Sequence, residues 1–179
     1  FDTGPANCLL DQWIHYHHKQ WFDEDGAWAA TANFDPTLLQ QFLSDPYFQL
    51  TPPKSTGLEY FNLNWLNTQL NSVDRPLSPA IVQASLCELT AISVERAIQQ
   101  FKSSQGVLVL CGGGSKNTYL KQRLAERCQN HRLLLSDDRG VPSEYLEAMA
   151  FAWIAKTSNI PDVTGAKNAT VLGGIYLKA

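Results

Sequence analysis

The stretch GVLVLCGGGSKNTYL, residues 106–120, is the part of the sequence that most constrains the fold. Val107 to Cys111 form a continuous apolar run of strand length, which is typical of a buried strand. Three glycines follow at 112–114, and a helical pattern begins near Asn117. A buried strand that leads through glycines into a helix predicts an α/β fold, because helices must cover such a strand's sheet.

The rest of the chain continues this alternation of helices and strands. Strands are expected at 107–111, 132–135 and 169–176, and Gly173-Gly174 breaks the last of them. Helices are expected at 5–19, 36–43 with Asp35 as its N-cap, 78–102, from about 117, and 143–157. The helix at 78–102 has so wide an apolar face that it should be central and buried on most sides. The order of elements predicts a short sheet flanked by helices.

Residues 44–62 form a long irregular segment with three prolines and four aromatic side chains. Loops of this length in a compact domain tend to be functional or disordered. The aromatic residues argue against disorder, because disordered segments are poor in them.

Composition places all 179 residues in a single domain and excludes several kinds of partner. The formal net charge is −3 and the pI is about 5.8, so neither nucleic acid nor an anionic membrane is an expected partner. There is no apolar run of about eighteen residues that could span a bilayer, and no signal-peptide pattern at the start. The four cysteines occur singly, which predicts a reduced, cytoplasmic chain without a zinc site.

The glycines at 112–114 allow two interpretations. A backbone without Cβ atoms lets a nucleotide approach closely, and the following helix offers free N–H groups. The spacing matches neither G-x-G-x-x-G nor G-x-x-x-x-G-K-[ST], so a tight strand-to-helix turn explains it equally well.

Two carboxylates are candidates for catalysis or binding. Asp2, in the opening FDTGPAN, can act as a general base if it ends a strand that faces a cleft, or it can cap the helix that follows. Glu147 shares a helix face with Phe151 and Ile154, which directs it to a cleft or to the edge of the core. Its alternative role is to interact with the helix dipole.

Metal sites are weakly supported by the sequence. His15 and His18 share a helical face, but no nearby carboxylate or cysteine completes a tetrahedral set. Asp23, Glu24 and Asp25 lack the alternation and terminal Glu of a calcium loop. We therefore assign no metal-ligating residue.

Several motifs together resemble the anhydro-N-acetylmuramic acid kinase family, of the actin-like, hexokinase-like sugar kinase superfamily. The matching stretches are FDTGPAN, LLDQW, DEDGAWA, LSDPYFQLTPPKSTGLEYFNLNWL, CELTA, VLCGGGSKNTYL, EAMAFAWIA and DVTGAKNATVLGGI. They cover essentially the whole chain but only about the second half of a family member.

The resemblance implies a ribonuclease H-like second lobe, truncated at its N-terminal strands, of a kinase in peptidoglycan recycling. The family uses ATP and Mg²⁺ to convert 1,6-anhydro-N-acetylmuramic acid into N-acetylmuramic acid 6-phosphate. Asp2 matches the family's catalytic base, while Asn7 and Glu147 would bind the sugar. The nucleotide would contact Gly112, Gly113, Gly114 and Asn117.

The resemblance also implies partners, and the sequence departs from the family pattern at two positions. The missing N-terminal lobe and a second copy of the chain are the expected partners, and the isolated chain is expected to be inactive. Ala6 stands where the family has a glycine, which a helical φ would tolerate, and Leu58 replaces an arginine. The alternatives are a non-catalytic nucleotide-binding or dimerisation module and a kinase for a different sugar.

Overall fold

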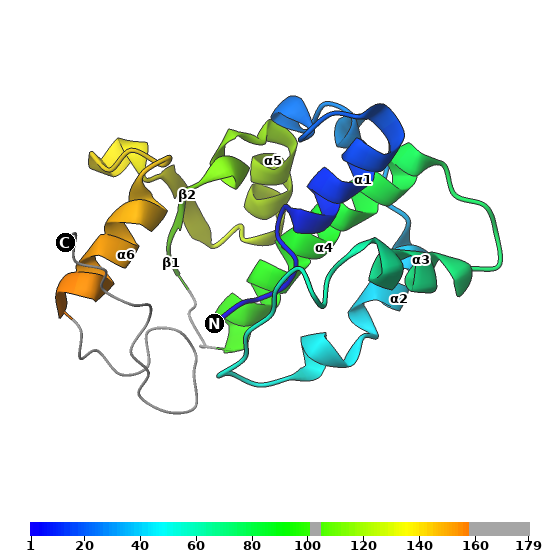
Figure 1. The fold of residues 1–179 in the computed structure, drawn as a ribbon, viewed down its shortest axis with the longest axis horizontal. Coiled ribbons are helices and arrows are strands. Elements are labelled where there is room, and N and C mark those ends of the chain that lie inside the picture. The colour runs from blue at the N-terminus through cyan, green and yellow to red at the C-terminus, as the bar shows by residue number, and fades with distance from the viewer. Residues whose placement is uncertain (101–104, 158–179) are drawn as a thin grey trace, which may run out of the picture.

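The computed structural model describes residues 1–100 and 105–157, the last four by backbone alone (Figure 1). The described helices are α1 (Cys8–His18), α2 (Pro36–Leu43), α3 (Leu63–Asn71), α4 (Pro79–Gln100), α5 (Thr118–Arg127) and α6 (Leu146–Thr157). The described strands are β1 (Gly106–Leu110) and β2 (His131–Leu135), and short 3₁₀ turns lie between several elements.

Side-chain caps fix where several helices begin. The Asp35 carboxylate accepts from the Leu38 N–H at 2.8 Å, so the predicted N-cap of α2 is confirmed. Asn62 caps α3 through the N–H groups of Asn64 and Trp65, and Asn117 caps α5 through the Leu120 N–H. Each cap satisfies an N–H group that has no partner within its own helix.

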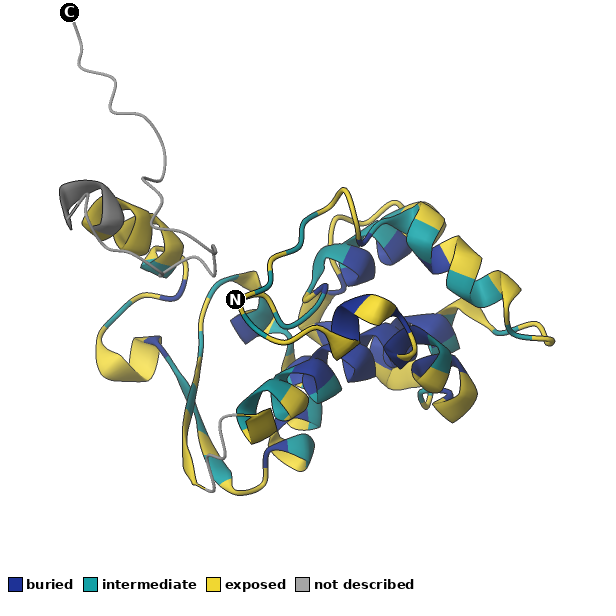
Figure 2. Ribbon diagram, turned by 90° about the horizontal axis from the view of Figure 1, so that it is seen from below, coloured by how far each residue is buried: buried dark blue, intermediate teal, exposed yellow. Residues whose placement is uncertain are grey.

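Helix α4 is the centre of the molecule, as its wide apolar face predicts. Residues 82–91 are all buried, which means that α4 is covered on every side over nearly three turns. Figure 2 shows the buried residues gathered along this helix and the elements around it. The core that packs there includes Leu9, Trp13, Leu38, Phe42, Phe61, Leu66, Leu86, Leu89 and Leu120.

Strands β1 and β2 form a two-stranded parallel sheet, joined by α5 as the crossover. The register pairs Gly106 with His131 and Leu110 with Leu135. On one face Leu108, Leu110 and Leu133 pack against the core. On the other face Val107 and Val109 are about half exposed, since successive strand residues point to opposite sides.

Helix α6 lies beside the sheet, away from the helical core (Figures 1 and 2). Its apolar residues Met149, Phe151 and Trp153 are more than half exposed. No helix within the described part of the chain has the length and apolar character to cross a membrane.

The expected α/β class, with a short sheet and flanking helices, is confirmed. The expected helices at 36–43 and 78–102 match α2 and α4 within two residues, whereas α6 begins three residues later than expected. Helix α3 was not predicted, and the expected strand at 169–176 lies outside the described residues.

A buried ion-pair network joins α4 to α5. Glu88 is fully buried, and its two oxygens accept from Arg123 Nε and Arg127 Nε, each at 2.6 Å. The hydrogen bond to Glu88 raises the pKa of Arg123 further above its ordinary value. Because Glu88 has no contact with water, it depends on both arginines for solvation.

Replacing Glu88 with glutamine should lower the free energy of unfolding by about 3 kcal/mol, since two partly buried guanidinium groups lose their counter-charge. Urea unfolding of the chain measures this. The matched control is Glu95→Gln, because Glu95 also pairs with Arg127, at 3.8 Å, but is partly exposed. This variant should lower the free energy of unfolding by less than about 1 kcal/mol. Equal losses in the two variants would contradict the burial argument.

The segment before α1 contains a strained residue. Ala6 has φ 47°, in the left-handed region, so the helical φ that would tolerate this alanine is not adopted. Thr90 Oγ1 of α4 donates to the Ala6 carbonyl at 3.1 Å and helps to hold this conformation. A glycine at this position would avoid the strain, because glycine has no Cβ.

Substituting Ala6 with glycine should raise the free energy of unfolding by about 0.5–1 kcal/mol, which is the relieved strain less the added entropy of the unfolded chain. Ala27 is a suitable control, because it is exposed and has φ −61°. Ala27→Gly should instead lower stability by about 0.5–1 kcal/mol. A loss of stability in both variants would show that Ala6 is unstrained.

Candidate functional site

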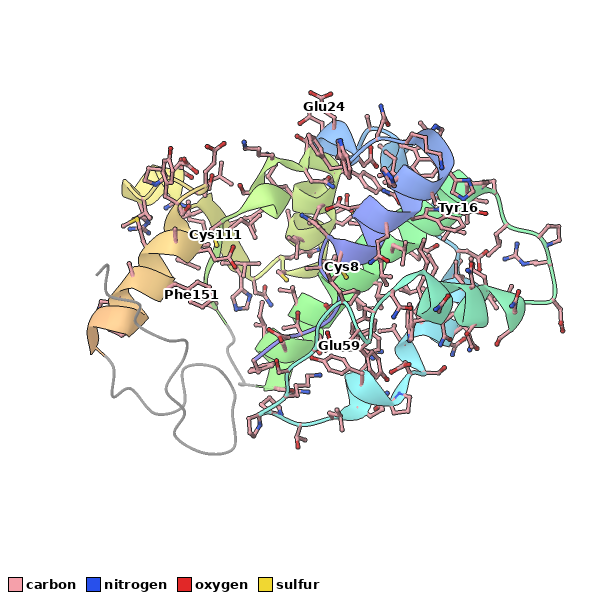
Figure 3. The ribbon with its side chains drawn as sticks, viewed as in Figure 1. Cys8, Tyr16, Glu24, Glu59, Cys111 and Phe151 are labelled. Carbon is pink, nitrogen blue, oxygen red and sulfur yellow. The ribbon has the colours of Figure 1, made fainter. Side chains whose placement is uncertain are left out.

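Two pockets meet at the segment Asp2–Asn7. The first has a volume of about 540 Å³ and is lined by Asn7, Leu10, Asp11, residues 22–25, Gly113, Lys116 and Asn117. The second has a volume of about 450 Å³ and is lined by residues 1–6, Cys8, residues 56–58 and Phe61. Figure 3 labels Glu24, which lines the first pocket, at the upper edge and Cys8, which lines the second, near the centre.

The glycine turn after β1 lies against the start of α1. Gly112 has φ 68°, and its N–H donates to the Ser143 carbonyl at 3.0 Å. Gly114 lies so close to Asn7 that an added Cβ would be 3.3 Å from Asn7 Nδ2. The fold therefore brings FDTGPAN and the three glycines together, although Asn7 and Gly112 are 105 positions apart in the sequence.

Asn7 carries an unsatisfied polar atom at this junction. Its Oδ1 is buried and has no hydrogen-bond partner in the described chain. Asn7 occupies the N-cap position of α1 but makes no side-chain cap bond. An unpaired buried acceptor costs about 1–3 kcal/mol, so this atom is a local source of instability beside the first pocket.

The first pocket is rich in carboxylates. Burial, followed by the charge of Asp23, raises the pKa of Asp11 to about 6, so Asp11 releases its proton close to neutral pH. Asp23 itself accepts from the N–H groups of Trp28 and Ala29. Lys116 forms an ion pair with Glu144, and both side chains are largely exposed to solvent.

Asp2 lies in the second pocket and is held by the loop at 45–61. Its Oδ2 accepts from Ser55 Oγ at 2.9 Å and from the Thr56 N–H at 3.0 Å. Its Oδ1 has no hydrogen bond within the described residues. One oxygen of the carboxylate is therefore fixed, and the other is available to accept a proton.

The loop that holds Asp2 is anchored by Asp45. The Asp45 carboxylate accepts from the Tyr47 N–H, from Tyr60 Oη at 2.7 Å and from Trp65 Nε1 at 2.8 Å. Burial raises the pKa of Tyr47 and of Tyr60 to about 12, so both hydroxyls remain donors at neutral pH. The aromatic residues of this segment give an ordered loop.

The predicted site residues fall in three places. Asn7, Gly113 and Asn117 line the first pocket, so Asn7 lies with the nucleotide candidates rather than with the sugar candidates. Asp2 lines the second pocket together with Ala6, whose neighbour in the chain, Asn7, lines the first. Glu147 is exposed on α6, and the cleft or core edge expected beside it is not formed by the described residues.

Sequence reasoning missed several side chains that shape the site. Ser55 and Thr56 were quoted only as part of a family motif, and Asp11 and Phe22 received no role. The one feature of the sequence that pointed to these residues was the length of the irregular segment at 44–62. It indicated a functional loop but not that the loop contacts Asp2.

The described residues contain no group of three His, Cys, Asp or Glu side chains arranged to hold a metal ion. The histidines of α1 contact aromatic rings instead. His15 stacks on Trp21 with ring centroids 4.9 Å apart, and His18 meets the edge of Trp28 at 4.4 Å.

Comparison with known proteins identifies the family. The family model described as anhydro-N-acetylmuramic acid kinase matches residues 1–178. Curated relatives with that name include proteins from Coxiella burnetii, 45% identical over 182 residues, and Pseudomonas fluorescens, 44% identical. These alignments cover 98% of the chain and 48% or 50% of the relatives, so the chain spans about half their length. The chain belongs to the anhydro-N-acetylmuramic acid kinase family.

Proposed function

We propose that this chain supplies the base and the nucleoside site of an ATP-dependent kinase acting on 1,6-anhydro-N-acetylmuramic acid. The observation that carries the proposal is the Asp2 carboxylate, held through Oδ2 and free at Oδ1 beside an open pocket. The relatives' names supply the substrate. Since the chain spans about half their length, activity requires the other half as well.

Asp2 acts on the water that opens the anhydro ring. Oδ1 accepts a proton from water while the water oxygen bonds to the anomeric carbon, and the bond from that carbon to O6 breaks. The released O6 attacks the γ-phosphorus of ATP, and ADP leaves. The product is N-acetylmuramic acid 6-phosphate, formed in a step of peptidoglycan recycling.

The first pocket takes the nucleoside rather than the phosphates. Its carboxylates Asp11, Glu24 and Asp25 disfavour a polyphosphate, and Lys116 is already paired. The same carboxylates accept hydrogen bonds from ribose hydroxyls or an amino group. The phosphates then extend past Ala6 towards Asp2.

Mg²⁺ enters this proposal only with the nucleotide. The ion usually binds one or two carboxylates together with substrate phosphates, and no described cluster forms a dedicated site. When bound it neutralises charge on the phosphates. We propose that Glu147 contacts the sugar once the other half of the enzyme is in place.

Replacing Gly113 with alanine should weaken nucleoside binding about tenfold without changing the melting temperature. A Cβ at Gly113 meets no protein atom within 4 Å, so the chain accommodates it, but it extends into the first pocket. Calorimetric titration of the chain with adenosine and with ATP measures both affinities, which should be similar. Unchanged affinity in the Gly113→Ala variant would show that the nucleoside does not bind in this pocket.

Asp2→Asn should reduce sugar phosphorylation by the complete enzyme by about 10²–10⁴-fold, because the amide cannot accept the water proton. ADP release that depends on the anhydro sugar is the measurement. Nucleotide affinity should be retained, which separates loss of the base from loss of the fold. Normal turnover by this variant would disprove the assignment.

A further inference from the structure

We propose that Ser55 is a positioning residue that orients the Asp2 carboxylate, and that the loop at 45–61 exists to hold this carboxylate in place. The inference rests on the proposed function and adds to it Ser55, a residue to which neither the sequence nor the family resemblance assigns a role.

Among the described residues, the hydrogen bonds of Asp2 come from this loop. The Asp2 N–H donates to the Lys54 carbonyl at 3.2 Å, and Tyr47 Oη donates to the Asp2 carbonyl at 2.7 Å. Two donors, Ser55 Oγ and the Thr56 N–H, converge on Asp2 Oδ2. The backbone and the side chain of one residue are thus held from the same side.

Two donors on one oxygen decide which oxygen does the chemistry. A carboxylate at an exposed chain segment rotates among several orientations, and each bond to Oδ2 removes some of that freedom. Oδ1 then remains as the acceptor that faces the second pocket. A base contributes fully only when it is aligned with the proton that it takes, so orientation is reflected in turnover.

The loop is rigid enough to transmit this orientation. Asp45 binds three donors, and Phe61 is completely buried next to Tyr47, with ring centroids 5.2 Å apart. Lys54 Nζ donates to the Tyr47 carbonyl and lies 4.7 Å from the centre of its ring. The backbone on either side of Ser55 is therefore anchored independently of Ser55.

Ser55 itself contributes little to the fold. It is exposed, and its hydroxyl bonds only to Asp2 among the described residues. Deleting this hydroxyl should therefore leave stability almost unchanged, as for most surface substitutions. A purely structural role for Ser55 predicts that its removal lowers stability, whereas a positioning role predicts that its removal lowers kcat at unchanged stability.

The test uses the complete enzyme with Ser55→Ala and Ser55→Thr. Ser55→Ala should lower kcat about tenfold and leave the KM for ATP and the melting temperature unchanged. Ser55→Thr keeps the hydroxyl and should recover most of the lost rate. The control is Ser44→Ala, whose exposed hydroxyl donates to the Gln41 carbonyl in the same region and does not touch Asp2. Its kcat should be normal.

Coupling to Asp2 separates this inference from the proposed function. In an Asp2→Ala background, Ser55→Ala should cause no further loss of rate. If Asp2→Asn abolishes turnover while Ser55→Ala retains it, the inference is overturned and the proposed base stands. If Asp2→Asn itself keeps normal turnover, both are overturned. An effect of Ser55→Ala on the KM for the sugar alone would show that Ser55 contacts substrate, which also overturns the inference.

Discussion

Burial of α4 on all sides is the constraint on which the rest of the structure depends. Over residues 82–91, where α4 has no solvent face, its polar side chains must find partners on the neighbouring elements. Ser85 Oγ accepts from the Asp35 N–H at the start of α2. Glu88 binds the arginines of α5, and Thr90 binds the carbonyl of Ala6. The buried polar residues of one helix thus set the positions of three other elements.

Both halves of the candidate site are fixed by this arrangement. Thr90 holds the segment that carries Asp2 and Asn7, and Glu88 holds α5, whose first turn follows the glycines. The contact between Asn7 and Gly114 is a consequence of these two attachments. Because Ala6 is strained, the packing and hydrogen bonds around this segment together offset the cost of a left-handed alanine, about 1–2 kcal/mol.

Local signals allowed part of the fold to be predicted, and long-range contacts account for the rest. The cap at Asp35, the wide apolar face of α4 and the apolar run of β1 each lie within a few residues, so their elements were predicted. Helix α3 was missed although Leu63, Leu66 and Leu70 have helical spacing, because the segment is short and mostly polar and only Leu66 is fully buried. Ser55 lies 53 positions from Asp2, and no periodicity relates the two.

The charges around the first pocket suit a nucleoside but not the phosphates of ATP. Phosphoryl transfer needs cations around the transferred group. Lys116 beside the first pocket is paired with Glu144, and burial lowers the pKa of Lys54, which is held on Tyr47. A neutral or hydrogen-bond-donating nucleoside suits the carboxylates of the first pocket, whereas a γ-phosphate does not. Under the proposed function, the charge of the phosphates is therefore neutralised by Mg²⁺ and by groups outside the described residues.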